Sequence, residues 1–290
     1  MEKENTKKEK SLNKMISIGD TLENTPLSRS IEHGLLTGFP EFDALIDGMM
    51  PGQLIVLASR PAMGKSALAL NIIQNICRDS NKSVAIFSYE MMAQELSMRM
   101  LAQNTKLETK KLREKSYTDQ DCKTLAQGIQ SLSSYSLQIS EDSRVNLTDI
   151  RLQCRKMKRE SGLDLIVVDY IQLVEPEKFT AREQQISELT RGLKSIAREL
   201  ECPVLALSQV NRGVEARPNK RPECSDLRES GSIEQDADGI WFVYRDEFYH
   251  KDSHEKGIAE IIVAKSRGGS TGTALLKYNS AYSSFESMDD

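Results

Sequence analysis

The sequence predicts an α/β fold with a mainly parallel, twisted sheet flanked by helices. From Gly34 to Gln209, short apolar runs of β-type composition alternate with segments of helical periodicity. This alternation is typical of parallel strands, because each parallel pair needs a crossover connection that a helix can supply. Further β-type runs separated by turns lie between Gly239 and Asn279. We expect them to extend the sheet as antiparallel strands at its C-terminal end.

The expected strands are rich in Val, Ile and Leu, and the expected helices repeat apolar residues every three or four positions. The strands are, in order, Leu54–Ser59, Val84–Glu90, Leu137–Ser140, Leu165–Tyr170, Pro203–Gln209, Gly239–Arg245, Ile258–Lys265 and Thr273–Asn279. The helices are Ser66–Arg78, Gln94–Gln103, Thr118–Leu132, Thr148–Glu160 and Glu183–Leu200. A polar stretch from Asn211 to Asp238 precedes the last group of strands, and the sequence has no solenoid or propeller repeat.

The 290 residues can form one large domain, which we place at residues 34–290. Residues 1–33 are polar and rich in Lys and Glu, so we expect a flexible arm with a linker helix around Met15–Ile31. The N-terminus lacks the apolar core of a secretory signal. The longest apolar run, Leu165–Val174, is too short to span a bilayer. We therefore expect a cytoplasmic protein that has no membrane partner.

The composition indicates a soluble, globular protein and excludes a disordered or membrane-embedded one. Hydrophobic residues make up 39% and charged residues 28% of the chain, and the mean hydropathy is -0.46. The net charge of -4 excludes a surface that is basic all over, although nucleic-acid contacts need only a local strip of cations. An odd number of widely spaced cysteines without a CxxC pair predicts reduced, mostly buried thiols: Cys77, Cys122, Cys154, Cys202 and Cys224.

The strongest chemical signal follows the first expected strand. The segment SRPAMGKS fits the phosphate-binding pattern GxxxxGK[ST], except that Ser59 replaces the first glycine. The expected nucleotide-binding residues are Ser59, Arg60, Pro61, Ala62, Met63, Gly64, Lys65 and Ser66. In such a loop, backbone N–H groups surround the phosphates of ATP, Lys65 neutralises them and the Ser66 hydroxyl binds Mg²⁺. The alternative is a strand-to-helix turn that contains GKS by chance.

Carboxylates end two further expected strands. Asp169 follows an apolar run, where a P-loop enzyme needs a carboxylate for its Mg²⁺ ion, although buried strands also end in Asp merely to begin a turn. Glu90 ends the run that begins at Val84, where it could activate the attacking water as a general base. The alternative for Glu90 is a place in the first turn of the next helix, which the helix dipole favours.

Polar residues at the ends of later strands suggest a sensor and a pair of trans-acting cations. Gln209 ends its expected strand, where an amide could sense the γ-phosphate, although surface amides at strand ends are common. Lys265 and Arg267 precede the turn signal Gly268-Gly269. They could supply positive charge to a neighbouring subunit's nucleotide, as an arginine finger does, or simply keep a hairpin soluble.

Together these stretches resemble the RecA-like motor domain of the DnaB-type replicative DNA helicases. The resemblance rests on RPAMGKSALALNI, AIFSYEM, LIVVDYIQL, PVLALSQVNR, SDLRESGSIEQDAD and AKSRGG, and it runs from about Gly34 to about Phe285. It implies ATP and Mg²⁺ as cofactors, with Glu90 as the catalytic base and Gln209 as the γ-phosphate sensor. It also implies that Lys265 and Arg267 reach the adjacent subunit's ATP. For the loop it implies phosphate binding, and for Ser66 and Asp169 it implies Mg²⁺ binding.

The resemblance implies partners as well. It makes the chain a subunit of a homo-oligomer, a hexameric ring that moves 5′ to 3′ on single-stranded DNA, with primase and a helicase loader as further partners. Arg228, Glu229 and Gly231 would contact the DNA backbone, as would a second loop at about Glu175–Gln184. The helical domain that usually precedes the motor domain in this family is absent from this sequence.

Two other functions stay open at the level of sequence. A short, non-motor paralogue could bind ATP and cap or regulate a helicase ring, and a RecA-like recombination ATPase would share the nucleotide site. Retention of a base, a sensor and a finger favours hydrolysis. Tyr89 and Met92 depart from the residues common around Glu90 in the family, and we expect little effect from them.

Overall fold

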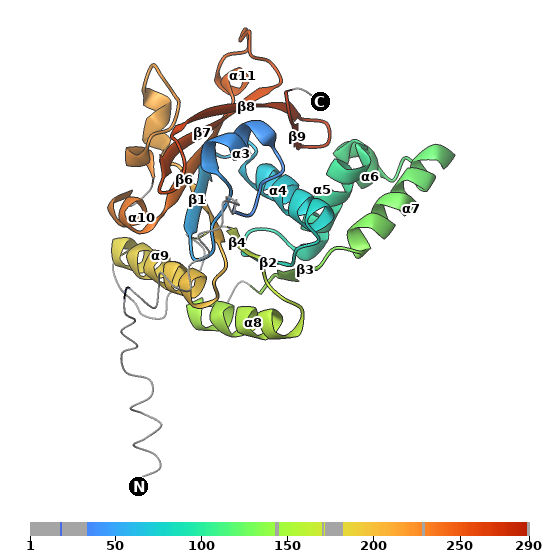
Figure 1. The fold of residues 1–290 in the computed structure, drawn as a ribbon. Coiled ribbons are helices and arrows are strands. Elements are labelled where there is room, and N and C mark those ends of the chain that lie inside the picture. The colour runs from blue at the N-terminus through green and yellow to red at the C-terminus, as the bar shows by residue number, and fades with distance from the viewer. Residues whose placement is uncertain are drawn as a thin grey trace. The chain divides into compact units, whose positions relative to one another are not determined.

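The computed structural model describes residue 18 and residues 34–142, 145–169, 171, 182–227 and 230–288. The part from His33 onward forms a single compact unit, and the description below concerns that unit. Its described residues build a 9-stranded sheet in the order β3-β2-β4-β5-β1-β6-β7-β8-β9 (Figure 1). The strands from β3 to β6 in this order run parallel, and β7, β8 and β9 are antiparallel to their neighbours.

The elements have the following bounds. The strands are β1 Leu54–Ser59, β2 Val84–Ser88, β3 Leu137–Ser140, β4 Leu165–Asp169, β5 Val204–Gln209, β6 Gly239–Tyr244, β7 Ile258–Ser266, β8 Gly272–Asn279 and β9 Ser284–Glu286. The α-helices are α3 Pro40–Ile46, α4 Lys65–Asp79, α5 Ala93–Thr105, α6 Thr109–Glu114, α7 Asp119–Ser133, α8 Leu147–Glu160, α9 Arg182–Glu199, α10 Ser230–Asp236 and α11 Asp246–Tyr249. Two 3₁₀ helices, η2 Arg212–Ala216 and η3 Cys224–Asp226, lie between β5 and α10.

The sheet separates two hydrophobic cores because each of its central strands is buried on both faces. In β1, Ile55 and Leu57 join the core beneath α3, α4 and α5, whereas Val56 and Ala58 join the core beneath α8 and α9. This division follows from the alternation of side chains along a strand. Burial on both faces explains why β1 is apolar throughout rather than alternating with polar residues.

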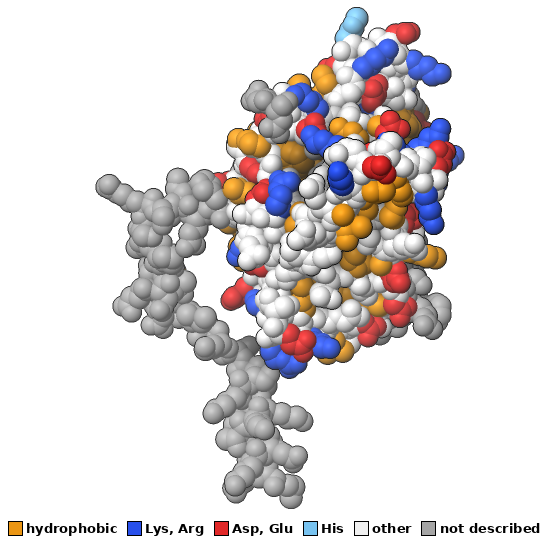
Figure 2. Space-filling view, turned by 90° about the vertical axis from the view of Figure 1, so that its right-hand side faces the viewer, with side chains coloured by type: hydrophobic (Ala, Val, Ile, Leu, Met, Phe, Trp, Pro, Cys, Tyr) orange, Lys and Arg blue, Asp and Glu red, His pale blue; other side chains and the backbone are white. Residues whose placement is uncertain are grey.

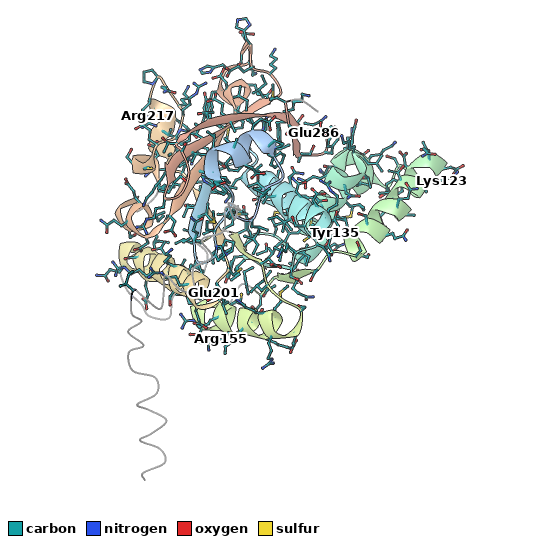
Figure 3. The ribbon with its side chains drawn as sticks, in the orientation of Figure 1. Lys123, Tyr135, Arg155, Glu201, Arg217 and Glu286 are labelled. Atoms are coloured by element: carbon teal, nitrogen blue, oxygen red, sulfur yellow. The ribbon has the colours of Figure 1, made fainter. Side chains whose placement is uncertain are left out.

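Side-chain caps and ion pairs fix several helices. Thr118 caps α7 and exchanges hydrogen bonds with Asp121, so the predicted first residue of this helix is its N-cap. At the outer surface, Arg155 of α8 pairs with Glu199 of α9 at 2.5 Å (Figure 3 labels Arg155). Among the described residues, no helix combines the length and the apolarity that crossing a membrane would require.

The predicted α/β class is confirmed, and every strand and helix predicted from residue 34 onward is present within a few residues of its expected bounds. The linker helix predicted around residues 15–31 lies outside the described residues, apart from residue 18. One detail was wrong. Of the C-terminal runs that we expected to be antiparallel, β6 pairs with β1 in parallel, and the antiparallel part begins with the β6–β7 pair. The polar stretch before β6 contains α10 and is long enough for a crossover, which a parallel strand needs.

Short elements escaped prediction because they carry too few residues for a periodic pattern. They are α3, α6, α10, α11 and β9. A second difference concerns β2, which ends at Ser88, so Glu90 lies beyond the strand rather than ending it. The cysteines are free, and Cys77, Cys154 and Cys202 are buried, as expected, whereas Cys122 is exposed.

Candidate nucleotide-binding site

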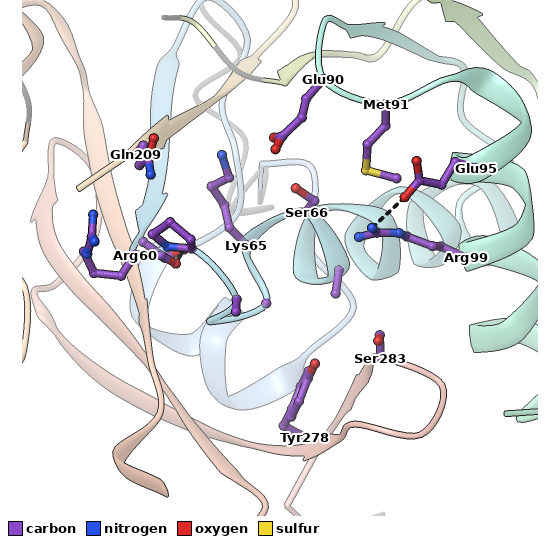
Figure 4. Close-up of a pocket in the computed structure, with 15 residues that line it drawn as sticks. Arg60, Lys65, Ser66, Glu90, Met91, Glu95, Arg99, Gln209, Tyr278 and Ser283 are labelled. Atoms are coloured by element: carbon purple, nitrogen blue, oxygen red, sulfur yellow. Dashed lines mark hydrogen bonds and ion pairs between the residues drawn. The ribbon is translucent and has the colours of Figure 1, made fainter. Parts of the chain in front are cut away.

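A cavity of about 600 Å³ opens at the carboxyl ends of the parallel strands, where ligands of open α/β sheets bind. It lies between the β1–α4 loop, the start of α5 and the β8–β9 hairpin (Figure 4). Its lining residues are Ser59, Arg60, Pro61, Ala62, Gly64, Lys65, Ser66, Ala67, Glu90, Met91, Glu95, Arg99, Gln209, Tyr278 and Ser283.

The loop between β1 and α4 has the backbone of a phosphate-binding loop. Gly64 caps α4 with a φ of 103°, and a Cβ atom at this position would lie 2.8 Å from Cζ of Phe285. Glycine is therefore required at position 64, both by conformation and by space. Helix α4 begins at Lys65, so its free N–H groups face the cavity, as they must to bind phosphate.

Lys65, which lines the cavity, pairs with Asp169, the last residue of β4. The Nζ atom of Lys65 lies 3.5 Å from Oδ1 of Asp169, and their side chains are 11% and 4% exposed. Burial lowers the pKa of Lys65, and the carboxylates of Asp169 and Glu90 oppose that shift. Two carboxylates, one at the end of β4 and one just beyond β2, thus favour the charged form of the lysine.

Asp169 and Ser66 carry oxygen atoms that fit a magnesium ion. Oδ1 of Asp169 is buried and makes no hydrogen bond, and the hydroxyl-bearing Ser66 lines the cavity beside Lys65. Magnesium in phosphate-transfer sites needs only one or two protein oxygens, because phosphate and water supply the others. The described residues contain no group of three or more His, Cys, Asp or Glu side chains that could bind a metal by themselves.

Glu90 and Gln209 reach the cavity from the two strands on either side of β4. Glu90 is exposed and lies within a turn in which the Ser88 hydroxyl donates to the carbonyl of Met91 at 2.6 Å. Figure 4 shows Glu90, Lys65 and Ser66 pointing toward one region of the cavity. Gln209 is the last residue of β5, which lies between β4 and β1 in the sheet.

Not every residue of the predicted loop faces the cavity with its side chain. Met63 is 1% exposed and belongs to the hydrophobic core. Arg60 is tied to the loop after β5, because its Nε donates to Glu215 at 2.7 Å and its Nη1 donates to the carbonyl of Val210 at 2.9 Å. Arg60 therefore links the phosphate-binding loop to the segment that follows Gln209.

Lys265 and Arg267 lie at the opposite end of the sheet. Arg267 pairs with Asp238, which directly precedes β6 and binds the backbone of Leu54 at the start of β1. The phosphate-binding loop follows the other end of β1. Since β1 has six residues and each strand residue rises about 3.3 Å, the two ends of β1 lie about 17 Å apart. Neither cation can reach the cavity of its own chain.

Several residues that line the cavity were not predicted from the sequence. Arg99 and Glu95 of α5 form an ion pair at 2.8 Å within the lining (dashed in Figure 4). Tyr278 lines the cavity from β8, and the guanidinium of Arg245 stacks 3.9 Å from its ring centre. The positions of these residues depend on how β8 and α5 pack around α4, which no sequence pattern reports. The aromatic residue Tyr278, near the end of the chain, was the one feature in the sequence that could have drawn attention to this wall.

Most of the predicted DNA-contacting residues lie outside the described ones. This applies to Arg228, Glu229 and residues 175–181 of the second loop. Gly231 is described and exposed, and a Cβ atom at this position would meet nothing within 4 Å. The face in Figure 2 carries interspersed Lys, Arg, Asp and Glu side chains, with no large area of a single charge.

The fold and the cavity define a P-loop nucleotide-binding domain. Residues 34–287 match the family model described as the DnaB-like helicase C terminal domain, and the chain therefore belongs to this family. The predicted family is thus confirmed.

Sequence relatives agree with this assignment. The chain is 47% identical over 258 residues to the replicative DNA helicase DnaB of Geobacillus stearothermophilus, which covers 88% of this chain and 57% of the relative. It is 43% identical over 277 residues to the replicative DNA helicase DnaC of Bacillus subtilis (strain 168), covering 95% of this chain and 61% of the relative. The chain thus spans less than two thirds of either relative.

Solved structures show the same fold. The ATPase domain of G40P superposes with a TM-score of 0.86 at 35% identity, covering 93% of this chain and 96% of that domain. A DnaB-like replicative helicase, solved in a study of its interactions with primase, gives a TM-score of 0.85 at 37% identity and covers 88% of this chain and 62% of its own. The RadB recombinase, at 20% identity and a TM-score of 0.56, shares the fold alone.

Proposed function

We propose that the chain is the ATP-hydrolysing motor domain of a replicative DNA helicase, working in the cytoplasm. In this function it forms a hexameric ring, hydrolyses ATP between subunits and moves 5′ to 3′ on single-stranded DNA. The observation that carries the proposal is the pair formed by Asp169 and Lys65, whose lysine lines a cavity of about 600 Å³. The relatives named above are replicative DNA helicases, which supports DNA as the substrate.

In the proposed reaction, the β1–α4 loop and Lys65 bind the phosphates of ATP, and Ser66 and Asp169 hold Mg²⁺. The ion supplies positive charge to the phosphates when bound. Glu90 accepts a proton from the attacking water, and it lies beyond the end of β2, on the side of the cavity facing Lys65. Gln209 contacts the γ-phosphate and passes its presence to Arg60 through the segment that begins at Val210.

The site is proposed to be completed by a second copy of the chain. Lys265 and Arg267 lie at the end of the sheet away from the cavity of their own chain. The side chain of Arg267 is 58% exposed, so it is accessible to a neighbour. An arginine supplied in trans stabilises the charge of a phosphoryl-transfer transition state and accelerates hydrolysis by about 10³–10⁵-fold. A ring in which each cavity faces the next subunit's Arg267 would meet this need.

The substrate is proposed to be single-stranded DNA, contacted through its backbone by Arg228, Glu229, Gly231 and the second loop. Backbone contacts grip DNA without reading its sequence, which suits a motor that moves along it. Primase and a helicase loader are the proposed protein partners of the assembled ring. The similarity to a helicase studied with primase supports the first of these.

The direct test of the proposed activity is steady-state ATP hydrolysis with and without single-stranded DNA. We expect Mg²⁺-dependent turnover that DNA stimulates, and we expect Lys65→Ala to abolish it. Lys123→Ala, which removes an exposed cation of α7 away from the cavity, is the matched control and should retain turnover. Nucleotide binding without turnover, with or without DNA, would contradict the motor function and favour a regulatory subunit of a helicase ring.

DNA contact is tested separately by the salt dependence of binding. We expect Arg228→Ala to weaken binding to single-stranded DNA and to lower the slope of log K against log salt by about one. The control is Lys123→Ala, which removes an exposed cation that projects from α7 at the edge of the molecule (Figure 3). An unchanged slope for Arg228→Ala, equal to that of the control, would remove Arg228 from the DNA path.

A further inference from the structure

Asp238, which directly precedes β6, makes two hydrogen bonds to Leu54, the first residue of β1. Its backbone N–H donates to the carbonyl of Leu54 at 2.8 Å, and its Oδ2 accepts from the N–H of Leu54 at 2.8 Å. The residue is 4% exposed. Because backbone and side chain both bind the same residue, the carboxylate of Asp238 has a fixed position in the fold.

A half-buried lysine, Lys194, balances this carboxylate. The Nζ atom of Lys194, on α9, lies 2.5 Å from Oδ2 of Asp238 and donates to the carbonyl of Gly52 at 2.7 Å. A buried carboxylate without a cation would be strongly destabilising. Lys194 supplies that cation from inside the fold, so a second cation at Asp238 is not required for charge balance.

Arg267 is nevertheless bound to the other oxygen of Asp238. Its Nη1 donates to Oδ1 of Asp238 at 3.1 Å, and its backbone N–H donates to the carbonyl of Asp238 at 3.0 Å. Its side chain is 58% exposed, and ion pairs this exposed add little to stability. Lys265 is anchored nearby, because its Nζ donates to the carbonyl of Glu234 in α10 at 2.5 Å. Both cations are therefore fixed to the segment 234–238.

We propose that Asp238 is the positioning residue of Arg267, which orients the guanidinium toward the phosphates bound by a neighbouring copy of the chain. The inference rests on the trans role proposed above for Arg267. A guanidinium carries five N–H donors in a rigid fork. When a carboxylate holds one arm through Nη1, the remaining donors keep one orientation and can bind phosphate oxygens with two parallel hydrogen bonds.

Two cations at one carboxylate suit this role. Lys194 neutralises Asp238 from the buried side, and Arg267 occupies the exposed side. When the guanidinium shifts toward a phosphate, the buried charge keeps its lysine partner, so the movement leaves no unpaired charge inside the fold. Asp238 thus restrains a long, flexible side chain without locking it.

The variant that tests the proposal is Asp238→Asn combined with Lys194→Met. The amide keeps the size of the side chain and an acceptor for Leu54, and the methionine removes the lysine that would lose its counter-charge. Lys194→Met alone is the matched control, because it leaves the Asp238–Arg267 pair intact. We expect the double variant to lose about 10²-fold in turnover relative to this control, as misplacement of a catalytic group does. Its KM for ATP should match that of the control. Its melting temperature should be at least as high, because the control keeps the buried Asp238 carboxylate without its lysine.

Mixing with Lys65→Ala subunits shows where the defect acts. Lys65→Ala chains have a disabled cavity and an intact Arg267, so they can complete the cavity of an Asp238 variant in a mixed ring. We expect turnover to recover in mixtures that co-purify through different affinity tags. The turnover recovered should equal that of Arg267→Ala chains mixed with Lys65→Ala chains in the same way. In an Arg267→Ala background, the change at Asp238 should have no further effect.

The outcomes separate this proposal from the one on which it rests. If Arg267→Ala recovers on mixing and the Asp238 variant does not, Asp238 acts within its own chain through β1 and the positioning role is wrong. Turnover of the double variant equal to that of Lys194→Met would also overturn it. If neither variant recovers in co-purified mixtures, the trans role of Arg267 itself fails.

Discussion

The ammonium group of Lys65 lies 3.5 Å from Oδ1 of Asp169, although the two residues follow strands that are not neighbours in the sheet. Lys65 follows β1 and Asp169 ends β4, with β5 between them. Lys65 therefore reaches across the end of β5, where Gln209 is placed. This arrangement brings a cation, a carboxylate and an amide together at one edge of the sheet.

Replacing Asp169 tests the magnesium site. Asp169→Asn removes a buried carboxylate oxygen that makes no hydrogen bond, so we expect Mg²⁺ to support nucleotide binding less well. Titration of a fluorescent ATP analogue at several Mg²⁺ concentrations should show at least a tenfold higher Mg²⁺ requirement, with little change in its absence. An unaltered Mg²⁺ requirement would exclude Asp169 as a metal ligand.

Glu90 should behave differently, because a general base is needed for turnover and not for binding. We expect Glu90→Gln to keep the affinity for the ATP analogue and to lose about 10²–10⁴-fold in turnover. Glu95→Gln is the control, since Glu95 lines the same cavity but pairs with Arg99. Equal losses in the two variants would assign Glu90 a general electrostatic role in place of proton transfer.

The sequence predicts those residues of the site that lie at or just beyond the ends of β1, β2, β4 and β5, which are consecutive in the sheet. Asp169 and Gln209 end apolar runs, and Lys65 closes the loop that follows another. Parallel strands place such ends on one edge of the sheet. Glu90 lies just beyond such a run. The cavity wall formed by Tyr278 and Ser283 could not be predicted, because it depends on β8 and β9 folding back over α4.

Two other features needed the structure for the same physical reason. The orientation of β6 relative to β1 depends on the path of the chain between β5 and β6. An apolar run of six residues fits a parallel or an antiparallel neighbour equally well. The contact between Asp238 and Arg267 joins residues 29 positions apart. No periodicity along the chain reports such a pairing.

Gly64 should be intolerant of any side chain. Gly64→Ala places a Cβ at a φ of 103° and 2.8 Å from Phe285, so we expect a loss of about 1–3 kcal/mol in unfolding free energy and weaker nucleotide binding. Gly268→Ala is the control, because an added Cβ there meets nothing within 4 Å. Urea denaturation of both variants checks this. Equal unfolding midpoints would show that the loop relaxes around the added methyl group.

The cap of α7 should make stability depend on pH. Hydrogen bonds from Lys111 and Thr118 lower the pKa of Asp121 from 3.8 to about 2. The unfolded chain then binds the proton more readily, so the stabilisation by Asp121 is complete above its unfolded pKa and is lost as pH falls toward about 2. The difference in urea midpoint between wild type and Asp121→Asn should shrink over that range. A difference that is independent of pH would contradict this role of Asp121 in the cap. The control is Asp119→Asn, at an exposed position of the same turn, which should have little effect on the urea midpoint at any pH.

Thiol labelling should separate the cysteines by exposure. Burial raises the pKa values of Cys77, Cys154 and Cys202 to about 12, and thiols react as thiolates. We expect an aromatic disulfide reagent at pH 8 to label the exposed Cys122 first, and the buried thiols only after unfolding. Cys122→Ser should remove the fast phase. A fast phase that persists in this variant would show that Cys122 is not the fast-reacting thiol, and would assign that phase to the half-buried Cys224 or to a buried thiol.

The central claim is that each nucleotide site is completed by a second copy of the chain. The measurement that tests it most directly is ATP turnover per chain over a wide range of protein concentrations, with the oligomeric state followed by light scattering at each point. We predict that turnover per chain rises steeply as the chain assembles and that Arg267→Ala assembles without this rise. Turnover per chain that is the same for the monomer and the assembly would contradict the claim.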